Sequence, residues 1–229
     1  MFNSLVSGMP VRPASEFIGD RGRAVCISGH REKNILPYKG DNVYAGITVS
    51  AVKLMLYRYI DMAAEKGYTE FISGLATGTD LWAASYVLKK KQSNPDIRLI
   101  GAMPYLRHAE KFTKTYLALL EKVERGADEL LTVSEVPDIA YGKHGRASEL
   151  YRDRNYFMVD RSSAVIAFVN RDSFASGTVQ TVNYAYKSGR LICSFGSDEI
   201  YGIMDRVGAD LRKIGREIAF LPNVFDEAL

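Results

Sequence analysis

The chain has 229 residues, 47% of them hydrophobic, and this length suits one domain with a sizeable core. Its 30 basic and 27 acidic residues leave a net charge of only +3, which argues against a surface built wholly for nucleic acid but leaves a local basic groove open. No stretch approaches the roughly 18 apolar residues of a membrane span, so no membrane partner is expected. Cys26 and Cys193 lie in apolar runs, which predicts buried thiols in a reducing, cytoplasmic setting.

Taken in order, the chain alternates between two kinds of apolar pattern. Residues 1–23 carry Pro10, Pro13 and three glycines without a sustained period, so we expect an irregular arm ahead of a domain over 24–229. Short apolar runs predict strands over 24–28, 70–73, 97–103, 129–133, 164–169 and 191–195. Helical spacing predicts helices over 46–66, 79–92, 112–123, 149–161 and 177–188, and one closing helix through 200–218. Gly67 stands where glycine commonly ends a helix.

This alternation predicts an α/β fold, with a single doubly wound, mainly parallel sheet and helices on both faces, as in Rossmann-like proteins. The carboxyl ends of parallel strands meet at one edge of such a sheet. We therefore expect the loops that follow the strands to converge there, although they lie far apart in the sequence. These loops contain Gly29–Arg31, Gly74–Thr79, Pro104–Tyr105, the segment around Lys143 and Ser176–Thr178.

The stretch from Phe71 to Ala84 reads as a buried strand, a glycine turn and the start of a helix. Gly74 and Gly78 have no side chains, so a ligand can approach the backbone closely there. Thr77 offers a hydroxyl near a helix N-terminus, which attracts anions. The pattern therefore fits a phosphate site, but strands also end this way in α/β proteins without a ligand. Asp80 fits a helix cap better than a ribose ligand.

A long connection follows the fourth predicted strand. It spans residues 134–148 and exceeds what a compact fold needs for a plain link. Such a loop is either a lid or disordered, and the sequence leaves both readings open.

Three separated blocks resemble one superfamily, the Rossmann-like SLOG group of DprA, the Lonely Guy enzymes and the YpsA-like proteins. Residues 73–80 look like the DprA glycine block, and Arg154-Asn155 looks like the Arg-Asn pair of its next block. Ser176-Gly177-Thr178, with Gly189-Arg190 and a strand behind it, resembles the last block. The short YpsA-like proteins are the most similar subgroup.

The resemblance implies a nucleotide-type ligand, with no certain further cofactor, at the carboxyl edge of the sheet. Ser176 and Thr178 are expected to donate to phosphate oxygens, although Thr178 also fits a simple helix cap. Arg31 fits either a phosphate ligand or a solvated charge. The expected site consists of Gly29, His30, Arg31, Gly74, Thr77, Gly78, Asp80, Pro104, Arg154, Asn155, Ser176, Gly177 and Thr178.

Arg154 is the candidate catalytic residue, because it aligns with an arginine that Lonely Guy enzymes place near the scissile N-glycosidic bond. Those enzymes also use a glutamate in a glycine-rich loop, and Thr181 stands in its place here. A threonine cannot act as that carboxylate, so phosphoribohydrolase activity is in doubt. Glu149, Asp153 and Asp160 are nearby alternatives, each of which also reads as a solvated helix charge.

We therefore expect a sensor or regulatory protein that binds a nucleotide or an ADP-ribose-like ligand. An N-glycosidic hydrolase and a single-stranded DNA adaptor like DprA are the alternatives, and a homodimer stays open. Aromatic residues that could stack on bases are Tyr105, Tyr141, Tyr151 and Tyr156. His30, His108 and His144 do not cluster as metal ligands do, so no metal is expected.

Overall fold

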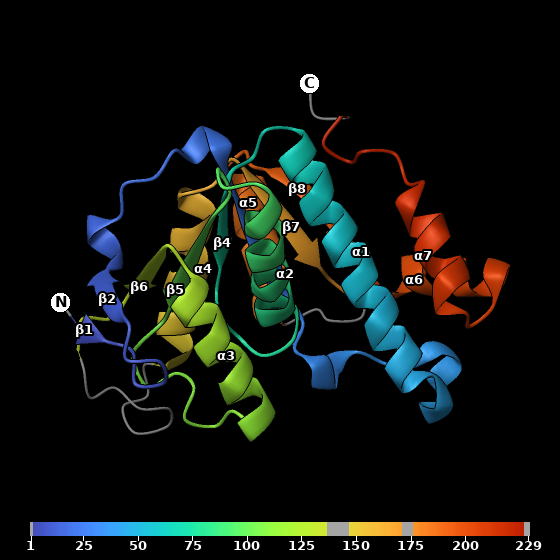
Figure 1. The fold of residues 1–229 in the computed structure, drawn as a ribbon, viewed down its shortest axis with the longest axis horizontal. Helices are drawn as coiled ribbons and strands as arrows, with labels where there is room; N and C mark the ends of the chain where they lie inside the picture. The colour runs from blue at the N-terminus through green and yellow to red at the C-terminus, as the bar shows by residue number, and fades with distance from the viewer. Residues whose placement is uncertain (1, 137–146, 171–175, 227–229) are drawn as a thin grey trace.

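A twisted sheet runs through the molecule between two layers of helices (Figure 1). The computed structural model describes residues 2–136, 147–170 and 176–226, so most of the expected 134–148 loop lies outside the described residues. The strands are β1 (Phe2–Asn3), β2 (Pro10–Pro13), β3 (Ala24–Gly29), β4 (Glu70–Ser73), β5 (Arg98–Met103), β6 (Glu129–Thr132), β7 (Ala164–Phe168) and β8 (Leu191–Phe195). Their order is β1-β2-β6-β5-β4-β3-β7-β8, and each pair from β2 to β8 is parallel.

The helices follow from the apolar spacing of the sequence. They are α1 (Ala45–Glu65), α2 (Thr79–Ser93), α3 (Lys114–Gly126), α4 (Ala147–Asp160), α5 (Gly177–Lys187), α6 (Ser197–Val207) and α7 (Leu211–Ala219). Within the described residues, short 3-10 turns η1 to η5 occupy Ala14–Glu16, Arg21–Arg23, Glu32–Asn34, Tyr38–Gly40 and Asn42–Tyr44. Gly67 has a φ of +86° just after α1, which confirms its expected place at the helix end.

The two faces of the sheet carry separate cores. One face packs against α1, α2 and α3, with α6 and α7 packed against α1, and the other face packs against α4, α5 and the segment around Phe17 (Figure 1). β7 is buried at every position, as its continuous apolar run predicts for a central parallel strand. The doubly wound, mainly parallel α/β fold is therefore confirmed. Within the described residues, no helix combines the length and apolar character needed to cross a bilayer.

Two expectations about secondary structure are corrected. The arm over residues 1–23 is not irregular throughout, because β2 pairs in parallel with β6 and buries Val11 completely. Pro10 and Pro13 obscure this strand in the sequence, since proline is tolerated near the end of a sheet rather than in its middle. The expected closing helix is two helices, because Gly208 has a φ of +76° and Asp210 caps α7 by accepting from the amides of Arg212 and Lys213.

The strand order creates a switch point between β3 and β7. From β3 the chain adds β4, β5 and β6 on one side, and it then returns to place β7 and β8 on the other. In open α/β sheets, ligands bind in the crevice at such a point, outside the carboxyl ends of the strands. Gly29 and Phe168 are register partners at these two strand ends.

Candidate functional site

A cavity of about 230 Å³ opens at the switch point, and we refer to it as the strand-end cavity. Its walls come from the exit of β3, the first turn of α2, the middle of α4 and the start of α5. The lining residues are Ser28, Gly29, His30, Arg31, Asn34, Ala76, Asp80, Tyr151, Arg154, Asn155, Ser176, Gly177 and Thr178. Segments more than a hundred residues apart in the sequence thus meet at one edge of the sheet.

The glycine turn after β4 packs tightly against the loop after β3. Gly78 has a φ of +90°, and a Cβ atom on it would lie 2.6 Å from the backbone nitrogen of Glu32. A Cβ atom on Gly29 would similarly meet the side chain of Thr79, whose Oγ1 donates to the carbonyl oxygen of His30 at 2.9 Å. Leu75 is fully buried with a φ of +57°, a sparsely populated conformation for a leucine. These glycines therefore allow two loops to approach each other.

A buried ion pair holds the same turn from the α4 side. Arg154 and Asp80 are 4% and 5% exposed, and Nη1 of Arg154 lies 3.5 Å from Oδ2 of Asp80. The same Nη1 donates to the carbonyl oxygen of Gly74, and Oδ2 of Asp80 accepts from the amide of Ala76. Burial raises the pKa of Asp80, and the guanidinium of Arg154 opposes that rise. Arg154 thus braces the turn, while its Nε has no partner among the described residues.

The first turn of α5 forms another wall of the strand-end cavity. Ser176 caps this helix, since its Oγ accepts from the amide of Val179 at 3.1 Å. Thr178 is buried and lies two residues after Ser176, within the first turn, so the cap is Ser176 rather than Thr178. The amide groups of the first turn carry partial positive charge into the cavity wall. Asp80 likewise lies in the first turn of its helix, whose N-cap is Gly78.

His30 joins the exits of β3 and β7. The side chain is buried, and its Nε2 accepts from the amide of Asn170 at 3.0 Å. Its ring also packs edge-on against Phe168, with the centroids 5.7 Å apart. Burial lowers the pKa of His30, so the ring is neutral and fixes the shape of the cavity rather than supplying charge.

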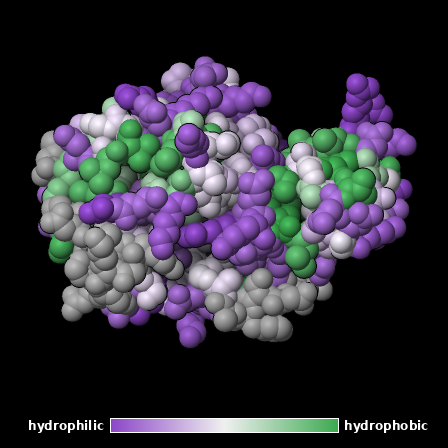
Figure 2. Space-filling view, turned by 90° about the horizontal axis from the view of Figure 1, so that it is seen from below, coloured by the Kyte–Doolittle hydropathy of each residue, from purple (hydrophilic) through white to green (hydrophobic). Residues whose placement is uncertain are grey.

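A second cavity of about 600 Å³ adjoins the first, and we refer to it as the side cavity. It shares Arg31 and Tyr151 with the strand-end cavity, so these two residues stand between the two spaces. Its further lining residues are Glu32, Lys33, Thr77, Arg107, His108, Glu110, Lys111, Phe112, Thr113 and Tyr116. Seen from the side on which β4 passes into α2, hydrophilic residues occupy the middle of the molecular face (Figure 2).

Most of the site residues expected from the sequence converge at the strand-end cavity. Nine line the strand-end cavity, namely Gly29, His30, Arg31, Asp80, Arg154, Asn155, Ser176, Gly177 and Thr178. Thr77 lines the side cavity instead. Gly74, Gly78 and Pro104 line neither cavity, and the carbonyl oxygen of Pro104 accepts from the amide of Ser134.

The expected set omits several residues that the fold brings to the cavities. Ser28, Asn34 and Ala76 line the strand-end cavity without any distinctive motif in the sequence. Tyr151 could have been included, because it precedes Arg154 by three residues and therefore shares its helix face. The ring of Tyr151 lies 5.8 Å from Cζ of Arg154.

The carboxylates considered for hydrolysis do not reach either cavity. Glu149, Asp153 and Asp160 line neither one. Asp153 pairs with Arg152, and Asp160 accepts from the hydroxyl of Tyr184. Thr181 is buried within α5 and donates to the carbonyl oxygen of Gly177 at 2.7 Å. Asp80, the carboxylate in the lining of the strand-end cavity, is paired with Arg154.

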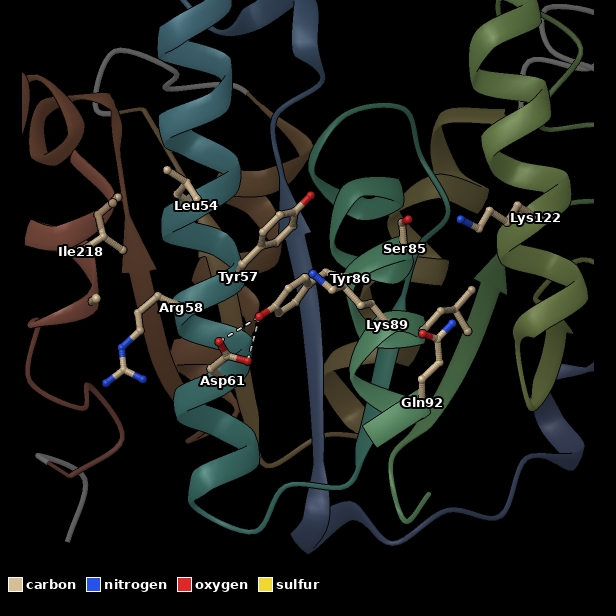
Figure 3. A pocket seen from close by; sticks show the side chains of 13 residues that line it. Leu54, Tyr57, Arg58, Asp61, Ser85, Tyr86, Lys89, Gln92, Lys122 and Ile218 are labelled. Carbon is tan, nitrogen blue, oxygen red and sulfur yellow. Dashed lines mark hydrogen bonds between the residues drawn. The ribbon is translucent and has the colours of Figure 1, made fainter. Parts of the chain in front are cut away.

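A larger hollow of about 840 Å³ lies on the outer helices, away from the strand ends, and we refer to it as the helix groove (Figure 3). Tyr57 from α1 stacks on Tyr86 from α2, with the ring centroids 4.1 Å apart. The hydroxyl of Tyr86 donates to Asp61 (Figure 3), and Lys90 pairs with the same carboxylate at 3.0 Å. The acidic group of this groove is therefore satisfied within the protein.

The part of the chain that the structure describes contains no cluster of side chains that could hold a metal ion. No three His, Cys, Asp or Glu side chains gather there as a cation site would require. Cys26 and Cys193 are free and buried, and burial raises the pKa of each thiol to about 12. Both thiols are therefore packing residues of the core.

Comparison with known proteins gives the family. A scan of family models matches residues 25–190 to YpsA, described as the YspA SLOG family. The uncharacterized SPbeta prophage-derived protein YoqJ of Bacillus subtilis (strain 168) is 29% identical over 131 residues, which cover 56% of this chain and 75% of YoqJ. A UPF0398 protein of Bacillus cereus (strain G9842) is 21% identical over 150 residues, covering 66% of this chain and 76% of that protein. Since the family match covers most of its length, the chain belongs to the YpsA family of SLOG proteins.

Proposed function

We propose that this protein binds a nucleotide or an ADP-ribose-like ligand at the carboxyl edge of its sheet and acts as a sensor or regulator. The observation that carries the proposal is the composition of the strand-end cavity. It combines the first turn of α5 with Arg31 at the switch point of the sheet. Phosphate groups bind readily at helix N-termini, and a guanidinium pairs with them through two parallel hydrogen bonds.

The charges in the strand-end cavity support an anionic ligand. The negative charge of Asp80 is offset by the buried guanidinium of Arg154. Arg31 is exposed and makes no ion pair within the described residues, so its charge is available to a ligand. The amides at the start of α5 add to this positive potential.

The size and shape of the site support a nucleotide rather than inorganic phosphate alone. The strand-end cavity offers the phosphate-binding features, while the adjoining side cavity provides further room and three aromatic side chains, Phe112, Tyr116 and Tyr151. Aromatic faces stack on bases. A ligand with a phosphate at one end and a ring at the other matches this arrangement.

A sensing role fits the site better than hydrolysis. In the lining of the strand-end cavity, the carboxylate is Asp80, and it is held by Arg154 and the amide of Ala76. A carboxyl group that acts as general acid or base must be free to exchange a proton with the substrate. Arg154 itself is occupied with the turn, although its unpartnered Nε keeps N-glycosidic cleavage as the second candidate.

Thermal unfolding in the presence of ADP, NAD and ADP-ribose tests the proposal. A ligand at a hundredfold excess over its Kd stabilises the folded state by about 2.7 kcal/mol, which gives a clear rise in Tm. Arg31→Ala should reduce the rise, whereas Lys89→Ala in the helix groove is the matched control. If none of the three ligands raises Tm and no nucleotide accompanies the purified protein, the proposal is wrong.

The hydrolase candidate has its own test. Incubation with nucleoside monophosphates, followed by chromatography for free base, should detect no release by the wild-type protein. Release of base that disappears in Arg154→Ala would establish catalysis and replace the sensor proposal. A variant that remains folded is required, since Arg154 also braces the turn after β4.

A further inference from the structure

His108 is a buried side chain in the side cavity with one ring nitrogen left unused. It is 6% exposed, and its Nδ1 lies 3.2 Å from the carbonyl oxygen of Tyr105. A carbonyl oxygen only accepts hydrogen bonds, so Nδ1 carries the proton and Nε2 presents a lone pair. Burial lowers the pKa of His108 to about 4, which keeps the ring neutral near pH 7. Nε2 is therefore an acceptor.

This acceptor has no partner within the described residues. Nε2 of His108 is buried and makes no hydrogen bond there. Buried polar atoms without a partner are uncommon, and each one calls for an explanation. Because His108 is part of the wall of the side cavity, a ligand in that cavity can supply the missing donor.

The surroundings of His108 favour a flat aromatic ligand. Phe112 packs edge-on against the His108 ring, with the centroids 5.8 Å apart. The hydroxyl of Tyr116 donates to Glu32, so this side chain offers the cavity its ring more than its polar group. Tyr151 stands between the side cavity and the strand-end cavity. The wall thus combines aromatic rings with the unpartnered acceptor of His108.

We propose that the side cavity holds the base of the bound nucleotide and that Nε2 of His108 accepts a hydrogen bond from an amino group on that base. This inference rests on the proposed nucleotide-binding function. It predicts preference for adenine or cytosine over hypoxanthine or uracil, whose carbonyl oxygen at the same position presents a second lone pair to Nε2. Sites built to hydrogen-bond one group discriminate strongly against an analogue that lacks it.

Binding of matched nucleotides tests the inference. Titration calorimetry compares ADP with IDP and CDP with UDP, since each pair exchanges an amino group for a carbonyl oxygen. The wild-type protein should bind at least one amino nucleotide about fivefold or more tightly than its keto counterpart, as expected when a buried acceptor loses its donor. If neither amino nucleotide is preferred over its keto counterpart, the inference is overturned while nucleotide binding stays in place.

Two variants connect the preference to His108. His108→Phe keeps an aromatic ring but removes Nε2, and it should bring the amino and keto members of the pair within about twofold of each other. Tyr86→Phe, which removes one hydroxyl in the distant helix groove, should keep the full preference. A preference that survives in folded His108→Phe overturns the inference. If His108→Phe does not fold, the wild-type comparison of the two pairs decides alone.

The same titrations separate a base from a ribose as the hydrogen-bond donor. The 2′-deoxy form of the nucleotide that binds should keep its amino preference and lose little affinity. If the 2′-hydroxyl matters in the wild-type protein but not in His108→Phe, the ribose is the partner and the inference is wrong. If none of the four diphosphates binds, the inference is overturned. If NAD and ADP-ribose also fail to raise Tm and no nucleotide accompanies the purified protein, the proposed function fails as well, which is a distinct outcome.

Discussion

The helix groove and the two cavities at the strand ends differ in how their polar groups are satisfied. In the groove, Asp61 accepts from Tyr86 and pairs with Lys90 (Figure 3). At the strand ends, Nε2 of His108 is buried without a partner, and Arg31 makes no ion pair within the described residues. The groove is larger, at about 840 Å³ against 600 and 230 Å³. We therefore base the proposed binding site on unused hydrogen-bonding capacity rather than on volume.

The helix groove also contains groups without a partner among the described residues. Nε of Arg58 in the helix groove is also buried without a partner in the described part of the chain. The same guanidinium pairs with Glu65 through Nη1 at 2.9 Å, so its charge is already offset. Lys89 and Lys122 of the groove also make no ion pair in the described part of the chain, so available cationic charge does not distinguish the two regions. The difference lies in the unpartnered acceptor of His108 and in the position of Arg31 at the switch point of the sheet, and matched substitutions test it.

Breaking an ion pair in each region should give the largest contrast. Arg154→Met leaves the buried carboxylate of Asp80 unpaired and should lower the free energy of unfolding by about 3–5 kcal/mol. Lys90→Met removes a partly exposed partner of Asp61 and should cost about 1 kcal/mol or less. Denaturant titration of both variants measures the difference, and equal losses would contradict the structural role assigned to Arg154.

Replacing one glycine of each region by alanine should give the second-largest contrast. Gly78→Ala forces an alanine into a conformation with φ of +90° and against the backbone of Glu32, so we expect a loss of about 3 kcal/mol. Gly215→Ala, within α7 beside the helix groove, meets only Leu54 at 3.8 Å and should gain up to about 1 kcal/mol of helix stability. Denaturation curves in which Gly78→Ala loses no stability would show that the turn tolerates a side chain.

Titration of His108 should contribute to the pH dependence of the free energy of unfolding. Its pKa falls from 6.5 to about 4 on folding, so the unfolded chain binds a proton that the folded chain does not between these values. The free energy of unfolding should therefore fall as the pH drops from 6.5 towards 5, with His108 contributing up to about 2 kcal/mol. His108→Phe should flatten this part of the curve. A slope unchanged by the substitution would mean that folding does not lower the pKa of His108.

The smallest effect is expected in the helix groove. Tyr86→Phe removes the hydroxyl that donates to Asp61 and should cost about 1 kcal/mol of stability. Ligand-induced stabilisation should not change, because Tyr86 does not line either cavity at the strand ends. Thermal shifts with and without ADP check this, and a lost ligand response would place the binding site in the groove.

Local pattern predicted the architecture and much of the strand-end cavity. The run from Phe71 to Ala84 folds as the expected strand, turn and helix, because the glycines and the apolar spacing act over a few residues. The parallel alternation also predicted that Gly29 and Ser176, far apart in sequence, would meet at one edge. Local patterns, combined with the rules of sheet topology, therefore predict contacts between residues far apart in the sequence.

The rest depends on tertiary contacts that no local pattern carries. Residues 104–113 have no regular period, so the burial of His108 and the aromatic wall around it could not be predicted. Arg154 was recognised through its motif, but its pairing with Asp80 depends on how α4 packs across the sheet. β2 was missed because its signal is four residues long and includes two prolines.

Calorimetric titration of ADP into three proteins tests the central claim most directly. The wild-type protein and Lys89→Ala, altered in the helix groove, should bind with Kd values within twofold of each other. Arg31→Ala should bind about tenfold or more weakly, because it loses a charge-assisted hydrogen bond to phosphate. Undiminished binding by Arg31→Ala, together with weaker binding by Lys89→Ala, would contradict the assignment of the ligand to the strand ends.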